Sequence, residues 1–443
     1  MLRQQRMRRG KRPISREHHA DRREIRSDLE LALALNAIVS HLARERDRVD
    51  IDTLRQSART RRNAFTFATF SSGGCCDAIA SLKTGLLPLW GTEVCDRKRS
   101  AWVDLTGTPD MGDTYKTDFS KLPVPDILWS GQTCVDYSLS GPKTGEDGTT
   151  GWMFVQQTEP ILQMQPNAVI IEMVGNAENI HDGREVNKVV AKLSTKYHVH
   201  RKVLRVRDYG DESNRERLIL CCLHKRLGTA AARYKFPAPY KNNNQTARDL
   251  ADPDSEVPKR LRIKVRGVRL FNRHDTPVPG RLYKLAQMGP GIGHSRRPNS
   301  LYSWDSTFNT QTTHNGGGVR PPLDWKRGDP ITWVRKTTKN EARKIASLPE
   351  SYIPWMSQFD PSDSYMYECI NMGVPIMTAE ALNESVISVL KQANQPETTP
   401  KQYNEIVHQA WGAKPIVAPP HTKRVKHTRM THGTGILPKW RER

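Results

Sequence analysis

Residues 64–74, AFTFATFSSGG, decide the fold class of this chain. The first seven residues are small, aromatic or β-branched and predict a buried strand, and the Ser and Gly residues at 71–74 predict a tight turn. The pattern that follows predicts a helix to about Lys83, with Gly85 as its stop. A strand, a glycine turn and a helix in this order begin an α/β fold.

The same alternation continues downstream. Apolar runs at 89–94, 126–130, 168–173, 199–206 and 217–223 predict further strands, and the patterns at 153–164 and 184–197 predict helices. Strands that alternate with helices predict a doubly wound, mostly parallel, Rossmann-like sheet.

Composition divides the 443 residues into five parts. They are a basic N-terminal arm with an amphipathic helix at 27–46 (together 1–62), the α/β domain (63–227), a smaller irregular domain rich in Pro, Asn and Gly (228–330), a return segment with helices at about 339–347 and 378–391 (331–392), and a basic C-terminal tail (393–443).

The charge balance predicts a polyanionic partner. Lys and Arg number 69 against 47 Asp and Glu, which gives a net charge of +22, and the sequence pI is about 9.8. Nucleic acid is the leading candidate, and the alternative is that basic tails solubilise the chain or address it to the nucleus.

Other composition features exclude several classes of protein. The seven cysteines lack CxxC spacing, so neither a zinc site nor a disulfide framework is predicted. The basic start has no apolar run behind it, and no stretch approaches the length of a membrane span. We therefore expect a protein that is neither secreted nor membrane-bound, nuclear if eukaryotic and otherwise cytoplasmic, with its oligomeric state open.

A second stretch, DILWSGQTCVDYS at 126–138, places Cys134 in a polar turn directly after a buried strand. This is where an α/β enzyme presents a nucleophile, because the turn after a strand lies at the edge of the sheet. The alternative is a buried, inert cysteine.

Across about 65–392, motifs in order resemble the cytosine-5 DNA methyltransferase family. The stretch FATFSSGGCCDAIASLKTG resembles the family's first motif in Phe70, Gly73 and Gly74, with Ser71 and Ser72 at the bend. The resemblance implies that these five residues bind S-adenosylmethionine, whose methionine end the turn and the helix N-terminus would receive.

Further cofactor residues follow from the resemblance. Glu93 in WGTEVCD would accept hydrogen bonds from the ribose. Asp118 in YKTDFSKLPVPDIL would read the adenine amino group, with Asp113 as the alternative register, and Gly131 and Val374 would complete the pocket. An aspartate that only caps a turn is the other interpretation of Asp118 and Asp113.

The resemblance assigns the nucleophile to Cys134. Its thiolate would add to carbon 6 of cytosine and so activate carbon 5 toward the methyl group. Thr133 stands where the family has proline, and Val135 where it commonly has glutamine.

Three more catalytic residues follow from the same resemblance. NAVIIEMVGNA retains Glu172, which would hold and protonate cytosine N3, but has Met173 in place of an asparagine that braces the nucleophile loop. NRERLILCCL supplies Arg215 and Arg217, two residues apart and so on one face of a strand, for the flipped nucleotide.

The last two motifs lie in the return segment. VRKTTKNEARKIASLPESY at 334–352 resembles the family's helix that supports the recognition region, and ECINMGVPIMTAEAL at 368–382 resembles the motif that completes the cofactor pocket. Residues 228–330 then fall where the family has its target recognition domain, and the loops at 281–293 and 308–318 are candidates for DNA contacts.

The resemblance implies a DNA (cytosine-5)-methyltransferase that acts on a flipped-out cytosine in duplex DNA. Two alternatives stay open, an RNA (tRNA) cytosine-5 methyltransferase of the same fold and a catalytically silent relative that binds nucleic acid. An NAD-type enzyme is disfavoured because SSGG is not GxGxxG. No metal is predicted.

Overall fold

The computed structural model describes residues 49–412, apart from 61, 140, 241–244, 266, 267, 269, 272–276, 278–280, 288–299, 309 and 311–317. The expected arm and helix before residue 49, the tail beyond 412, residues 288–293 of the predicted loop 281–293 and most of the loop 308–318 lie outside the described residues. Contacts divide the chain into a short unit, Met1–Val49, and a second unit, Asp50–Arg443.

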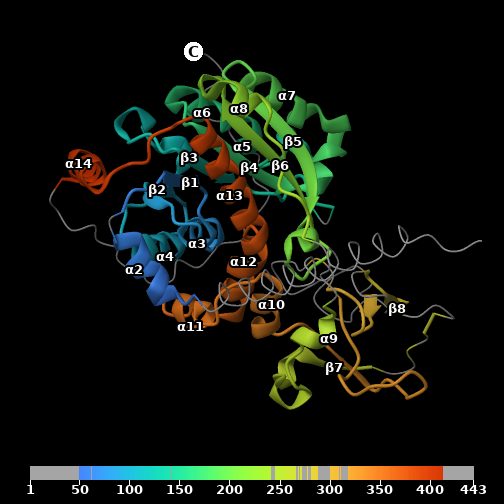
Figure 1. The fold of residues 1–443 in the computed structure, drawn as a ribbon. Coiled ribbons are helices and arrows are strands. Elements are labelled where there is room, and N and C mark those ends of the chain that lie inside the picture. The colour runs from blue at the N-terminus through green and yellow to red at the C-terminus, as the bar shows by residue number, and fades with distance from the viewer. Residues whose placement is uncertain are drawn as a thin grey trace, which may run out of the picture. The chain divides into compact units, whose positions relative to one another are not determined.

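A six-stranded sheet in the order β2-β1-β3-β4-β6-β5 lies at the centre of the second unit (Figure 1). Its strands are β1 (Thr66–Phe70), β2 (Leu87–Thr92), β3 (Ile127–Gly131), β4 (Ala168–Val174), β5 (Tyr197–Arg205) and β6 (Glu216–His224). Strands β2, β1, β3 and β4 are parallel, and β6 is antiparallel to both of its neighbours. The predicted mostly parallel sheet is confirmed.

The direction of β6 brings its first residues to the functional edge of the sheet. Parallel strands end at one edge, and an antiparallel strand begins there. The register accordingly pairs Gly131 with Glu172 and Val174 with Arg217. Four loops and the start of β6 therefore converge at this edge.

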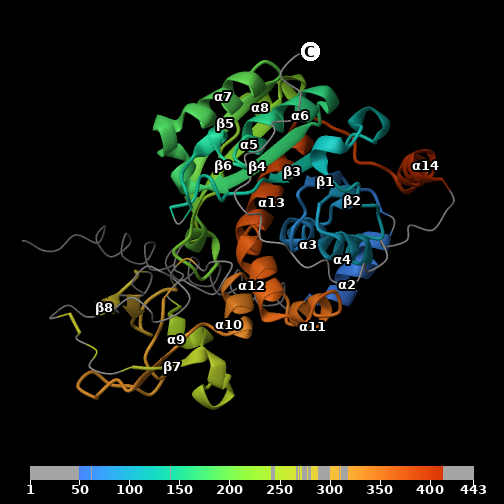
Figure 2. The same cartoon turned by 180° about the vertical axis from the view of Figure 1, so that it is seen from behind.

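Helices pack in two groups around the sheet (Figures 1 and 2). One group contains α2 (Ile51–Arg59), α3 (Cys76–Lys83), α4 (Asp96–Thr106) and α13 (Ile376–Gln392), and the other contains α5 (Met153–Gln156), α6 (Thr158–Met164) and α7 (Arg184–Leu193). No helix in the described part of the chain is long and apolar enough to cross a membrane.

The return segment packs against the first glycine turn. It forms α10 (Lys339–Ile345), α11 (Tyr352–Met356), α12 (Asp363–Met372) and α13, so both predicted helices are present. The Tyr352 hydroxyl donates to the Gly74 carbonyl at 2.9 Å. A Cβ at position 74 would collide with the Cys369 carbonyl, so this approach requires glycine.

Two predicted boundaries differ from the structure. Helix α8 (Gly228–Ala232) contacts β6 and α13, and Tyr234 hydrogen-bonds Ser385 at 2.9 Å, so the sheet domain continues beyond 227. Residues within the predicted tail form α14 (Pro400–Trp411), which begins with a capping box at Thr399. The buried Tyr403 donates to the Pro88 carbonyl and ties α14 to β2.

The smaller region has two short antiparallel pairs and its own core. Strand β7 (Arg262–Lys264) pairs with β10 (Trp333–Arg335), and β8 (Lys284–Gln287) pairs with β9 (Ser300–Tyr302). Its core contains Leu285, Leu301 and Val334.

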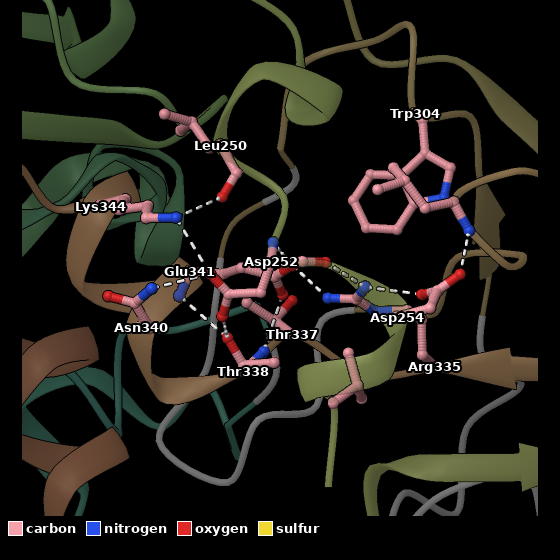
Figure 3. A network of polar contacts seen from close by, with 12 residues as sticks. Leu250, Asp252, Asp254, Trp304, Arg335, Thr337, Thr338, Asn340, Glu341 and Lys344 are labelled. Atoms are coloured by element: carbon pink, nitrogen blue, oxygen red, sulfur yellow. Dashed lines mark hydrogen bonds and ion pairs between the residues drawn. The ribbon is translucent and has the colours of Figure 1, made fainter.

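A buried polar network joins the two chain segments that enter and leave the smaller region (Figure 3). Arg335 forms an ion pair with Glu341 and donates to Asp254 at 2.9 Å. Asp252 accepts from Asn340 at 2.7 Å and from Lys344 at 3.0 Å. We call this network the neck.

Candidate functional site

A cavity of about 320 Å³ opens at the edge where the parallel strands end. It is lined by residues that follow β1, β2 and β3, by residues of β4 and the start of β6, and by residues after α12. Eleven of the predicted site residues meet there: Ser71, Ser72, Gly73, Gly74, Glu93, Gly131, Cys134, Glu172, Arg215, Arg217 and Val374.

Two predicted cofactor residues do not line the cavity. Phe70 is fully buried and packs against Trp90 and Phe119, with ring centroids 6.0 and 5.1 Å apart. Asp118 caps a 3-10 helix and pairs with Lys121 at 2.8 Å, and about half of its side chain is exposed.

The cavity lining thus includes the alternative residue, Asp113, and not Asp118. Both aspartates cap short helices, so the sequence pattern did not distinguish them.

The glycine turn supplies donors at one end of the cavity. Ser71 and Gly73 have φ values of +58° and +51°, which bend the chain sharply after β1. The Gly73 N–H donates to Glu93 Oε2 at 3.0 Å, and the Cys95 N–H donates to Oε1 at 2.9 Å. The buried Ser72 Oγ has no hydrogen-bond partner among the described residues, so it is available to a bound molecule.

Asp110 and Lys98 support Glu93, and sequence reasoning missed both. Asp110 accepts the Glu93 N–H at 3.1 Å and that of Gly112 at 2.9 Å. Burial raises the pKa of Asp110 to about 7, although the hydrogen bond from Gly112 and the charge of Arg99 oppose the rise.

Lys98 lines the cavity and pairs with Glu368 at 2.6 Å. Burial opposes its charge, but Glu93 and Glu368 outweigh burial and raise the pKa of Lys98. Its place on α4, five residues after Glu93, is the signal in the sequence that could have suggested it.

Tyr115 and Met153 also line the cavity without having been predicted. The Tyr115 hydroxyl donates to the Met153 carbonyl at 2.8 Å, and its ring packs on Trp152 with centroids 4.7 Å apart. An aromatic residue two positions after Asp113 is the sequence signal that could have suggested this wall.

Cys134 lies three residues beyond β3 and is partly exposed to the cavity. Burial raises the pKa of the Cys134 thiol, and the carboxylate of Glu172 adds to the rise while Arg217 opposes it. The thiol is therefore the resting form, and positive charge from Arg217 is what favours the nucleophilic thiolate.

Glu172 and Arg217 form a buried ion pair beside Cys134. They are diagonal neighbours on one face of the β4–β6 pair, since Val174 is the direct partner of Arg217. Burial raises the pKa of Glu172, and Arg217 opposes this rise. Arg215, just before β6, donates to the Asn371 carbonyl at 2.9 Å and so faces the return segment.

No group of three or more His, Cys, Asp or Glu side chains within the described ranges could hold a metal ion. The chemistry available here is a thiol, a protonatable carboxyl group and two guanidinium groups at one end of the cavity, and hydrogen-bonding groups around a glycine turn at the other.

Comparisons with known proteins point to one family. The family model for the C-5 cytosine-specific DNA methylase matches residues 104–388. The Type II methyltransferase M.NlaX of Neisseria lactamica is 34% identical over 289 residues, which are 64% of this chain and 83% of that protein. The Type II methyltransferase M.HhaI of Haemophilus parahaemolyticus is 27% identical over 64% of this chain and 82% of its own length.

A solved structure shows the same fold. The Entamoeba histolytica methyltransferase EhMeth has a TM-score of 0.52 at 12% identity, with 74% of this chain and 99% of that chain covered.

Proposed function

Because the chain belongs to the C-5 cytosine-specific DNA methylase family, it is a DNA (cytosine-5)-methyltransferase, and we propose how its cavity residues perform the reaction. The observation that carries the proposal is that Cys134, Glu172 and Arg217 share one cavity with the glycine turn and Glu93. A nucleophile and an acid thus lie at one end of a cavity whose other end has the groups that a nucleoside needs.

The residues of the glycine-turn end fit S-adenosylmethionine. The unpartnered Ser72 Oγ and the turn at the start of α3 would hold its methionine end, Glu93 its ribose and Asp113 its adenine. The bound cofactor supplies an electrophilic methyl group.

The opposite end would receive a cytosine that has left the base stack. The Cys134 thiolate forms a bond to carbon 6 while Glu172 donates a proton to N3, and electron density moves to carbon 5. Carbon 5 takes the methyl group, and water then removes the carbon-5 proton. The electron pair of that C–H bond restores the double bond between carbons 5 and 6, the Cys134 thiolate leaves carbon 6, and N3 returns its proton to Glu172. Arg217 orients Glu172 and, as the proton leaves Glu172, retains a carboxylate partner.

Fluorocytosine in duplex DNA tests this assignment, because fluorine at carbon 5 cannot leave as a proton. The protein with cofactor should form a covalent adduct that survives a denaturing gel, and Cys134→Ala should form none. Cys95→Ser is the matched control, because Cys95 is the other partly exposed cysteine of the described residues and lies outside the cavity lining.

The same gel separates the alternatives. An adduct in Cys134→Ala would refute the assignment of Cys134 as the nucleophile. Adduct with fluorocytosine RNA but not DNA would favour an RNA methyltransferase, and no adduct despite measured binding of DNA and cofactor would favour a silent relative.

A further inference from the structure

Two positions that brace the nucleophile loop elsewhere in the family carry other residues here. Thr133 precedes the nucleophile, and unlike proline it does not fix the backbone angle φ. Met173 has no amide group, so it cannot make the hydrogen bonds of an asparagine, and its side chain is buried in the hydrophobic core of the sheet domain. Residues 134–151, the nucleophile loop, therefore need another support.

The Asp136 side chain accepts the hydrogen bonds that close this loop. It is 2% exposed, and its Oδ1 accepts from the Thr144 hydroxyl at 2.9 Å. Its Oδ2 accepts from both the N–H and the hydroxyl of Thr150, at 2.9 and 2.8 Å. Its own carbonyl accepts the Gly145 N–H at 3.1 Å. One side chain thus joins the beginning of the loop to its middle and its end.

The glycines of the loop allow this closure. A Cβ at Gly148 would collide with the Asp136 carboxylate, and one at Gly151 would collide with the Gly145 carbonyl. The backbone therefore approaches Asp136 at positions where only glycine fits.

Tyr137, the next residue, connects the closed loop to the sheet. The buried Tyr137 donates from its hydroxyl to the Gly151 carbonyl at 3.0 Å. Its carbonyl accepts from Asn176 Nδ2 at 3.1 Å, and Asn176 follows β4 three residues after Met173. Thr150 itself lines the cavity, so the support extends from the sheet to the site.

We propose that Asp136 is a positioning residue for methyl transfer, which closes the nucleophile loop and holds Cys134 at the cytosine position. This inference rests on the proposed role of Cys134 as nucleophile. Burial disfavours the Asp136 carboxylate, but the hydrogen bonds from Thr150 and Thr144 outweigh burial and hold its pKa below the ordinary value, so the closed loop persists at neutral pH.

The test compares Asp136→Ala with Asp147→Asn. Asp147 is on the same loop, but its side chain is 81% exposed and 3.7 Å from Arg184, so its variant removes a charge without opening the loop. Asp136→Ala should accelerate hydrogen exchange at the N–H groups of Gly145 and Thr150. It should also slow adduct formation with fluorocytosine DNA about 10- to 100-fold, since misplacement of a reacting group by 1 Å has an effect of this size.

Affinities for DNA and cofactor should change less than about twofold, because phosphate contacts carry most DNA affinity. Asp147→Asn should match the wild type in each measurement. A milder pair covers the case in which Asp136→Ala does not fold: Thr144→Val should slow adduct formation several-fold, and Thr144→Ser, which keeps the hydroxyl, should restore the rate.

Several outcomes would overturn the inference: unchanged exchange in Asp136→Ala, faster exchange with a normal rate of adduct formation, or equal rates in the two Thr144 variants. A wild-type protein that forms no adduct would instead refute the proposed function, and the positioning role would fail with it. A normal wild-type adduct with a normal Asp136→Ala rate refutes only this inference.

Discussion

Replacing Glu172 by Gln should reduce both the stability of the protein and the rate of its chemical step. Glu172 and Arg217 are less than 10% exposed and form a direct ion pair. Two unit charges about 3 Å apart attract by about 5 kcal/mol at an effective dielectric constant of about 20. Because the pKa of Glu172 is raised, the burial of the carboxylate outweighs this attraction. Breaking such a pair typically costs 3–5 kcal/mol, because the remaining charge stays buried.

Gln keeps an amide oxygen for the Arg217 donors and carries no charge to bury, so we expect a loss below that range, about 1 kcal/mol. The rate of adduct formation should fall about 100-fold or more, because Gln cannot donate the proton that cytosine N3 needs. Urea unfolding measures the first effect and the fluorocytosine gel measures the second.

A double-mutant cycle with Arg217→Met separates the two effects. Removing both charges leaves no buried unpaired ion, so the double variant should be more stable than the sum of the single losses by at least about 1 kcal/mol. Its adduct formation should stay slow. Additive stabilities would show that the pair is not coupled, and a normal rate in Glu172→Gln would refute the acid role.

The pH dependence gives an independent check. The pKa of Glu172 is raised, so above the pKa of the unfolded carboxyl group the folded state holds a proton that the unfolded state has lost. This contribution to stability falls as the pH rises through the folded pKa. The reaction needs both the protonated Glu172 and the Cys134 thiolate, whose fraction increases with pH because its pKa is raised. The rate should therefore rise with pH and level off above the pKa of Glu172, whereas in Glu172→Gln it should go on rising through that range.

Three further predictions concern binding. Glu93→Ala should weaken the binding of S-adenosylmethionine by about 1–3 kcal/mol, measured by calorimetry, and an unchanged affinity would show that Glu93 is not part of the cofactor site. Asp113→Ala should weaken cofactor binding because Asp113 lines the cavity, whereas Asp118→Ala should not; the reverse result would assign the adenine contact to Asp118. Deleting the basic segments 1–48 and 413–443 should lower the slope of log DNA affinity against log salt by several units, and an unchanged slope would exclude them from phosphate binding.

The sheet and the position of Cys134 were predictable because each has a strong local pattern, whereas the roles of Glu172 and Arg217 followed from the family resemblance. Fully buried strands give continuous apolar runs, and Cys134 directly follows one of them. The carboxyl group of Glu172 and the guanidinium group of Arg217 belong to such runs and meet through strand register alone.

Other features depend on contacts between distant segments. Asp113 and Asp118 have the same capping pattern, and only the folded chain shows which one reaches the cavity. Helix α14 packs on the core of the sheet domain through Tyr403, Ile406, Val407 and Trp411, a contact between segments about 315 residues apart at Tyr403 and Pro88. The role of Asp136 depends on the hydroxyl groups of Thr144 and Thr150, which are 8 and 14 residues away, and no local sequence pattern predicts these hydrogen bonds.

The neck determines where the smaller region could be exchanged between related proteins. A transplant with the composition-based limits 228–330 would carry Asp252 and Asp254 but leave Arg335 and Glu341 in the host. The guanidinium group of Arg335, 1% exposed, would then lose its Asp254 partner unless the incoming segment supplied a carboxylate at the same place. Cuts placed before 250 and after 344 would transfer every charged residue of the neck together. A chimaera built on those limits would therefore keep the neck's ion pairs intact while it gained a new surface.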